Sequence, residues 1–152
     1  MNIESQFSMC ENCKFDRKCC KMVPPMIFEF EKSKFVGNIF FENFRNNRVP
    51  LLKKDKTGCI FLENNRCQIY KNRPFNCRLF PFDIRKVGSM LYWVLLDFCY
   101  IPNNTEQQLT EFEKILSKSS EDELYLYIDY TTKSSCFRDM KYQTLREIVW
   151  QK

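Results

Sequence analysis

Nine cysteines and not a single histidine are the feature that most constrains this chain of 152 residues. Without histidine, the chain has no Ser-His-Asp or Cys-His catalytic pair. It also cannot hold zinc, haem or non-haem iron through imidazole. We therefore expect cysteine thiols to carry the chemistry of this protein.

The cellular compartment determines whether these thiols stay reduced or form disulfides. The chain opens MNIESQFSMCENCKFDRKCC, without the basic and then apolar segments of a secretory signal. Its longest apolar run, residues 90–96, is too short for a membrane span and suits a buried strand or short helix. We expect a cytoplasmic protein without a membrane segment, in which reduced thiols bind metal; a disulfide scaffold is the alternative.

The charge is modestly basic, with 24 Lys+Arg against 19 Asp+Glu, a formal net charge of +5. A metal or 4Fe–4S cluster held by four thiolates carries a charge of about −2, so the basic excess can offset bound metal. An ordinary solvated surface is the other interpretation. No Lys/Arg block indicates nucleic-acid binding, and we expect a protein partner of unknown identity. The sequence leaves the oligomeric state open.

The C-terminal part, residues 101–152, has the apolar periodicity of helices. Capping boxes at 105–108 and 120–123 mark two helix starts. After the first, Leu109, Phe112 and Leu116 follow at helical spacing. Residues 124–130 are ambiguous between helix and strand, and 138–150 predict a last helix.

The preceding part combines short helices and short strands. Residues 26–44 predict one or two short helices, and 49–70 predict loops and short strands. Residues 82–99 predict a hairpin that turns at 87–89, and we expect Tyr70 and Trp93 in the core. The fold class is thus α+β, a single small domain over 1–152. In it, a cysteine-rich, metal-organised region (10–100) packs on C-terminal helices.

The cysteines fall in groups. Cys10 and Cys13 have the two-residue spacer that turns two sulfurs toward one metal. Cys19 and Cys20 are adjacent, so they serve two nearby sites, or one ligates while the other packs or reacts. The predicted metal ligands are eight in number, enough for two four-cysteine sites or for one site with spare thiols: Cys10, Cys13, Cys19, Cys20, Cys59, Cys67, Cys77 and Cys99. We expect Cys136 to be a plain thiol.

A more specific pattern lies in residues 58–82. It reads GCIFL at 58–62, CQIY at 67–70, Arg73-Pro74, and CRLFPF at 77–82. With the CxxC and CC pairs, this order resembles the YkgJ-type cysteine-cluster family, known for a CxxCxxCC start and a zinc- or iron-chelating domain. Cys99 lies where that family commonly carries a later cysteine. The resemblance covers about residues 10–100 and implies metal binding through these cysteines.

Iron–sulfur and zinc are the two cofactors to consider. An all-thiolate set with many aromatic neighbours favours 4Fe–4S clusters, and zinc is the alternative. The pattern is distantly similar to flagellin lysine-N-methylases, where it is associated with a 4Fe–4S cluster and methyl transfer from S-adenosylmethionine.

We expect electron transfer or a partner-dependent module. The alternatives are a cluster-dependent enzyme, with S-adenosylmethionine-linked methyl transfer or redox chemistry, and a structural zinc-binding interaction domain. Whether the chain is an enzyme stays open; its 3 glycines offer no glycine-rich nucleotide loop.

Arg73 and Arg78 have two interpretations. As cofactor-binding residues, their guanidinium groups offset the charge of a thiolate-bound metal or clamp a carboxylate or phosphate of a ligand. Alternatively, Arg73-Pro74 marks a turn, and Arg78 pairs with an acid such as Asp83.

Overall fold

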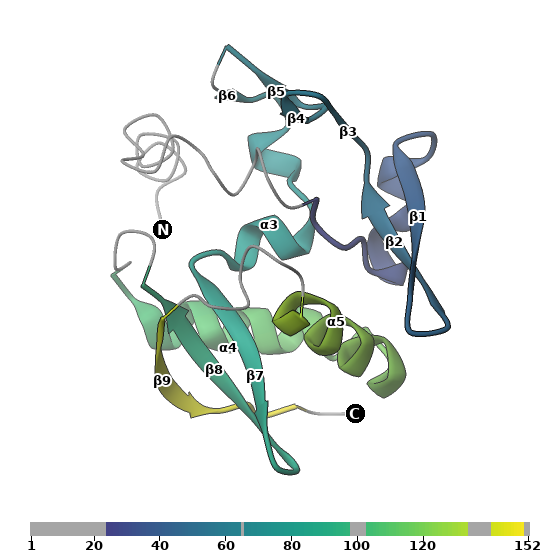
Figure 1. Ribbon diagram of the computed structural model, residues 1–152. Coiled ribbons are helices and arrows are strands. Elements are labelled where there is room, and N and C mark those ends of the chain that lie inside the picture. The colour runs from purple at the N-terminus through teal and green to yellow at the C-terminus, as the bar shows by residue number, and fades with distance from the viewer. Residues whose placement is uncertain (1–23, 65, 98–102, 134–140, 151–152) are drawn as a thin grey trace. The chain divides into compact units, whose positions relative to one another are not determined.

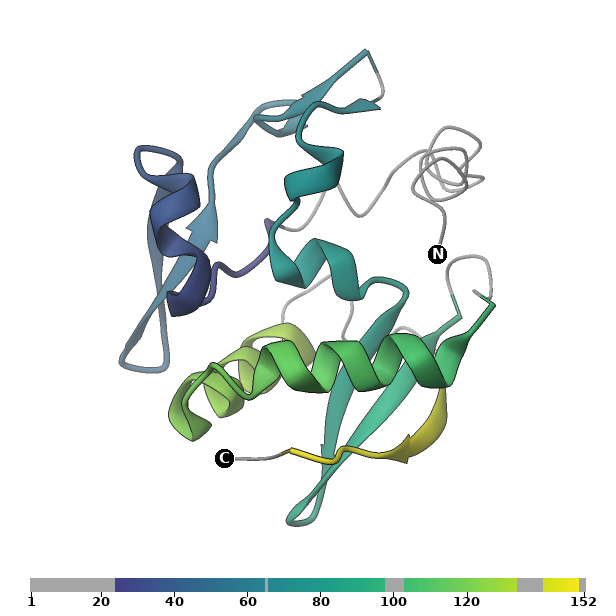
Figure 2. The ribbon, with the colours of Figure 1, turned by 180° about the vertical axis from the view of Figure 1, so that it is seen from behind.

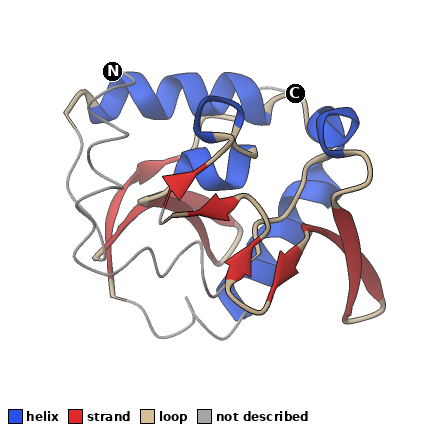
Figure 3. Ribbon diagram, turned by 90° about the horizontal axis from the view of Figure 1, so that it is seen from above, coloured by secondary structure: helices blue, strands red, loops and turns tan. Residues whose placement is uncertain are grey.

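The computed structural model describes residues 24–64, 66–97, 103–133 and 141–150. Helices and strands both contribute to the fold (Figure 3), which confirms the α+β prediction. The chain divides into two compact units, Met1–Arg78 and Leu79–Lys152. One domain over 1–152, with the cysteine region packed on C-terminal helices, stays a prediction. In the described ranges, no helix is long and apolar enough to cross a membrane.

The first unit consists of short elements (Figure 1). Among its described residues, η1 and η2 are 3-10 helices, and α3 ends one residue beyond the unit. In chain order the elements are η1 (Glu29–Phe35), β1 (Ile39–Phe44), β2 (Asn47–Leu52), β3 (Lys54–Asp55), β4 (Gly58–Cys59), β5 (Leu62–Glu63), β6 (Arg66–Cys67), η2 (Tyr70–Asn72) and α3 (Phe75–Leu79).

The prediction of one or two helices over 26–44 is wrong for its second half. Only η1 is helical, and β1 pairs antiparallel with β2 from Ile39↔Leu52 to Phe44↔Asn47. The turn between them is made by Arg45 and Asn46, both with positive φ (48° and 66°). Two such residues match the twist of a tight hairpin, so this turn fixes β1 as a strand despite its helix-like run of Phe.

Short strands over 49–70 are confirmed. The pairs β3–β4 and β5–β6 are two-residue antiparallel ladders. They adjoin a small apolar cluster in which Ile27, Phe35 and Leu52 are fully buried and four partly buried side chains pack against them: Ile39, Cys59, Phe61 and Ile69. Such short ladders give little stability alone, so this cluster is a main source of their order.

The second unit contains a three-stranded antiparallel sheet in the order β7-β8-β9. The hairpin of β7 (Phe82–Val87) and β8 (Met90–Leu96) is confirmed, with Gly88 at φ 63° in its turn. Trp93 is completely buried, as predicted. Figures 1 and 2 show α4 (Thr105–Leu116) running across the sheet, behind the strands in one view and in front of them in the other.

Helices begin at both predicted starts, but the first capping box does not form. α4 has its N-cap at Asn104, one residue before the predicted Thr105, and this cap makes no side-chain hydrogen bond. The rings of Phe82 and Trp93 on the sheet lie 6.3 and 6.1 Å from that of Phe112 on α4. The ambiguous residues 124–130 belong to α5 (Glu121–Lys133), where the Ser120 hydroxyl accepts the N–H of Glu123 at 3.1 Å.

The helix predicted over 138–150 is wrong where the structure describes it, since residues 142–147 form the strand β9 (Tyr142–Glu147). β9 pairs with β8, with an irregularity between Trp93 and Val94. Unpaired backbone along β8 is a strong template for another strand. That long-range pairing outweighs the helical spacing of the apolar residues in this segment.

Candidate metal centre

Three of the eight predicted ligands lie in the described ranges, and all three are half-buried: Cys59, Cys67 and Cys77. Half-burial suits a ligand, because the sulfur is shielded from water but still reachable. The other five lie outside the described residues: Cys10, Cys13, Cys19, Cys20 and Cys99. Cys136, expected to be a plain thiol, lies outside them too.

Cys59 ends β4, directly opposite Lys54 of β3. Side chains of directly paired residues project from the same face of a ladder, so Lys54 and Cys59 lie on one face of this ladder. Cys59 also packs against the apolar cluster of Ile27, Phe35 and Leu52, which anchors its backbone.

Cys67 ends β6, opposite Leu62. The ladder is closed by a bond from the Gln68 N–H to the Phe61 carbonyl at 2.8 Å, and the Gln68 side chain donates to the Glu63 carbonyl at 3.1 Å. Gln68 therefore fixes the tight turn that precedes the cysteine. The residues of the CQIY motif around Cys67 thus have a local structural role.

Cys77 lies on α3, and a buried carboxylate holds the start of this helix. Oε1 of Glu31 accepts the N–H of Phe75 at 2.8 Å, and Oε2 accepts the N–H of Phe28 at 3.0 Å. Burial raises the pKa of Glu31 above 4.5, although the hydrogen bonds from Phe28 and Phe75 and the charges of Lys34 and Arg78 act in the other direction.

A second link fixes the same helix. Oδ1 of Asn76, the residue before Cys77, accepts the N–H of Met26 at 2.9 Å. The ring of Phe75 meets the ring of Phe28 edge-on at 5.6 Å. Two polar links and one aromatic contact thus tie α3 to residues nearly fifty positions earlier, and they position Cys77.

Arg73 and Arg78 differ in their surroundings. The Arg73 guanidinium lies 3.9 Å from the centre of the Tyr70 ring, and its Nε donates to the Tyr70 carbonyl at 2.9 Å. Arg78 is exposed and contributes a positive charge near Glu31. Asp83, suggested as the partner of Arg78, instead binds Arg85 at 2.6 Å, so that pairing was wrong. Cofactor binding by the two arginines stays a prediction.

Sequence reasoning missed Glu31, Lys54 and Asn76 as residues around the cysteines. Glu31 sits three residues after Phe28, where an acid can reach back to a helix start, and this was a usable signal. Strand register places Lys54 opposite Cys59, and Asn76 bonds to a residue fifty positions away; spacing alone reveals neither.

The described residues do not complete a metal site by themselves. Among them, no group of three or more Cys, Asp or Glu side chains is arranged to hold a metal ion. The donor chemistry nevertheless fits zinc and iron–sulfur, because both take thiolate sulfur. A four-thiolate site that uses these cysteines needs ligands from outside the described ranges.

The basic charge is concentrated in the unit that carries most cysteines. Residues 1–78 contain 15 Lys+Arg and 8 Asp+Glu, a net charge of +7, whereas residues 79–152 contain 9 and 11, a net charge of −2. Seven of the nine cysteines belong to residues 1–78. The surplus of cations thus accompanies the groups that become anionic when they bind metal.

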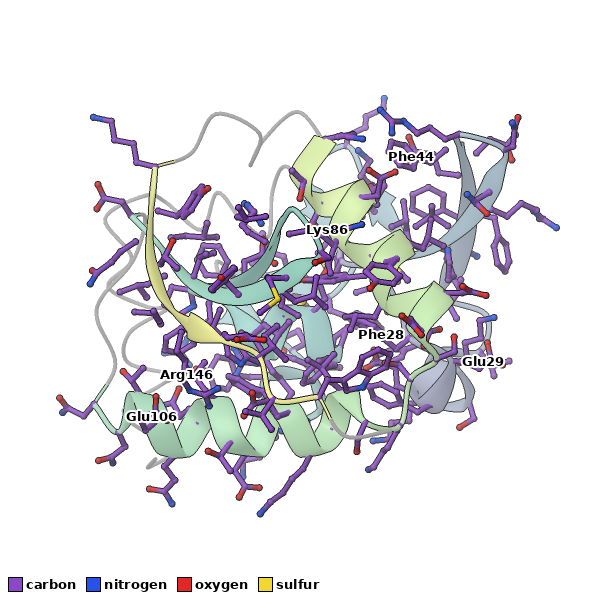
Figure 4. The ribbon with its side chains drawn as sticks, turned by 90° about the horizontal axis from the view of Figure 1, so that it is seen from below. Phe28, Glu29, Phe44, Lys86, Glu106 and Arg146 are labelled. Atoms are coloured by element: carbon purple, nitrogen blue, oxygen red, sulfur yellow. The ribbon has the colours of Figure 1, made fainter. Side chains whose placement is uncertain are left out.

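Two polar networks, one buried and one partly exposed, stabilise the second unit. Asp83 accepts hydrogen bonds from Arg85 at 2.6 Å and from the Tyr127 hydroxyl at 2.8 Å. Arg146 bridges Glu106 and Glu113, each at 2.9 Å, and Figure 4 shows it beside Glu106 at α4. Asp83 is paired with Arg85, and Glu106 and Glu113 share Arg146, so we interpret both networks as structural.

Comparison with known proteins identifies one family. The family model CxxCxxCC, described as "Putative zinc- or iron-chelating domain", matches residues 9–114. All eight predicted ligand cysteines fall inside this range, and Cys136 falls outside it. No curated protein and no solved structure matches the chain.

Proposed function

The chain belongs to the CxxCxxCC family of zinc- or iron-chelating domains, and from this premise we propose that its cysteines hold one or two 4Fe–4S clusters. The ligands would be the eight cysteines of the matched range: Cys10, Cys13, Cys19, Cys20, Cys59, Cys67, Cys77 and Cys99. Such a cluster supplies one-electron chemistry, which suits an electron-transfer module that works with a partner.

The observation that carries the proposal is the support given to the described cysteines. Cys59 and Cys67 end short strands, and Cys77 lies on a helix held by Glu31 and Asn76. Fixed, half-buried thiols lose little freedom when they bind metal. The free energy of metal binding also stabilises the unit, whose cysteine-bearing strands form ladders of only two residues.

Charge favours thiolate ligation in the same unit. Four thiolates around a cluster or a divalent metal leave a charge of about −2, and two such sites leave about −4. The net charge of +7 over residues 1–78 accommodates either number. We further propose that Arg73 and Arg78 lie near the bound group, where they offset its charge or bind an anionic ligand.

Zinc is the second candidate, because the family description names zinc and iron alike. Four thiolates make a closed tetrahedral zinc site, which stabilises a fold but leaves no open position for chemistry. The protein would then be a structural interaction domain.

The decisive experiment is made on protein purified without oxygen. We expect brown protein with broad absorption near about 400 nm and with iron and sulfide in equal amounts. About four irons per chain indicates one cluster and about eight indicates two. Colourless protein with stoichiometric zinc would replace the iron–sulfur proposal with the zinc one.

Two variants test the ligand set. We expect Cys67→Ser to lose metal and solubility together, because the site loses a ligand and the unit loses the stabilisation given by the metal. Cys136→Ser is the matched control, since it makes the same change outside the matched range, and it should retain its metal. A folded, metal-replete Cys67→Ser protein would remove Cys67 from the site.

A further inference from the structure

The hairpin of β1 and β2 ends in a surface that contains two arginine–phenylalanine pairs. The Arg48 guanidinium lies 4.5 Å from the centre of the Phe41 ring, and the Arg45 guanidinium lies 5.6 Å from that of Phe44. Figure 4 labels Phe44 at one of these pairs. We call these four residues the hairpin tip.

The hairpin tip is exposed although it is rich in aromatic atoms. Phe41 keeps 48% of its surface accessible, and both arginines are exposed. Exposed Phe and Arg side chains are the residues enriched at the centres of protein interfaces. The hairpin tip thus has the residue composition of an interface at an exposed position.

Strand register explains why Phe41 and Arg48 meet. Arg48 lies directly opposite Asn43, and Phe41 is two positions from Asn43 on the same face of β1. A diagonal contact across a hairpin follows from this alternation. A guanidinium over an aromatic ring can present its N–H groups to a carboxylate in a bidentate pair.

The positive charge around the hairpin tip indicates the charge of its partner. The hairpin tip belongs to residues 1–78, whose net charge is +7, so the surrounding field attracts an acidic partner. A nucleic acid is the competing anion, but base stacking needs an open aromatic face. Cations occupy the surroundings of the Phe41 ring, with Arg48 at 4.5 Å and Lys32 at 6.0 Å.

We propose that the hairpin tip docks an acidic segment of a partner protein. The two arginines bind carboxylates of the segment, and the part of Phe41 that stays exposed packs against its apolar atoms. The four residues of the hairpin tip include no cysteine, so the proposal does not depend on which metal the protein holds.

The test uses the full chain, purified with its metal, and a fluorescent peptide of about twelve residues rich in Asp and Glu. We expect Arg48→Glu and Arg45→Glu each to weaken binding about tenfold or more, and Arg48→Lys to weaken it a few-fold because it keeps the charge but loses the planar fork. Phe41→Ala should also weaken binding. Circular dichroism verifies that each variant is folded.

The matched control is Lys118→Glu, which makes the same charge change at an exposed position of the second unit. It should change the affinity less than about twofold. Equal loss in Lys118→Glu and Arg48→Glu would reduce the effect to net charge and overturn the proposal. Tighter, Arg48-dependent binding of a single-stranded oligonucleotide would overturn it in favour of a nucleic-acid surface.

Discussion

The buried carboxylate of Glu31 offers the sharpest test of how the fold supports Cys77. It is only 4% exposed, and its two oxygens accept the N–H groups of Phe28 and Phe75. Replacing Glu31 with Ala removes both acceptors at once. The start of η1 and the start of α3 are then left with buried, unsatisfied donors.

The size of the effect follows from those two bonds. A buried donor that loses its partner costs about 1–3 kcal/mol. The burial that raises the pKa of Glu31 opposes its charged form and offsets part of the gain. We therefore expect Glu31→Ala to lower the free energy of unfolding by about 2–4 kcal/mol, and Glu31→Gln, which keeps one oxygen, by about 1–3 kcal/mol.

The pH dependence has a definite sign. The pKa of Glu31 is higher in the folded chain than its ordinary 4.5, mainly because of burial. Folding therefore favours the protonated acid, and this contribution is fully present below pH 4.5 and is lost as the pH rises through the folded pKa. The stability advantage of the natural chain over Glu31→Gln should shrink as the pH rises from about 4 to about 7.

Urea unfolding of the metal-bound protein measures these differences, and a metal titration of each variant measures the effect on the site. Glu29→Ala is the matched control, because Glu29 is an exposed acid two positions earlier that pairs with Lys32 at the surface. We expect it to lose less than about 1 kcal/mol. A Glu31→Ala protein as stable as Glu29→Ala would refute the anchoring role.

Two further predictions concern the second unit and are checked by urea unfolding. Asp83→Ala should lower the free energy of unfolding by about 3–5 kcal/mol, because it leaves the Arg85 guanidinium buried and unpaired. Tyr127→Phe removes only one hydrogen bond to Asp83 and should lower it by about 1 kcal/mol. Equal losses in the two variants would contradict the charge argument. Burial opposes the charged form of Glu113, but hydrogen bonds, first from Arg146, keep its pKa below 4.5. The stability lost in Arg146→Ala should therefore be largest at neutral pH and should fall as the pH drops below 4.5, the opposite trend to that of Glu31.

Local signals in the sequence predicted much of the second unit. The capping box at Ser120 and Glu123 forms the expected bond, and the hairpin turns at Gly88 as expected. Each signal lies within a few residues of what it specifies, so no knowledge of distant neighbours was needed. The helix prediction failed at residues 142–147 for the opposite reason, because they form a strand by pairing with the edge of β8.

The first unit was harder to predict because its order comes from distant contacts. The run of Phe over 26–44 looked helical, but the positive φ angles of Arg45 and Asn46 reverse the chain there. The eight ligand cysteines were predicted from motif spacing and all lie in the range that the family model matches, and their role as ligands stays a prediction. Their structural support was not found, because Glu31 and Phe75 are 44 positions apart and Met26 and Asn76 are 50 apart.

The division of charge connects the two proposals. Residues 1–78 carry seven cysteines and a net charge of +7 before any thiol ionises. One four-thiolate site reduces that charge to about +5. Two sites would take their eighth thiolate from Cys99 of residues 79–152, and even their whole charge of about −4 leaves residues 1–78 positive. An acidic partner is therefore attracted whichever number of sites is filled, and more strongly when metal is lost. If both proposals hold, removing the metal while the unit stays folded should strengthen binding of the acidic peptide at low salt, and high salt should abolish the difference.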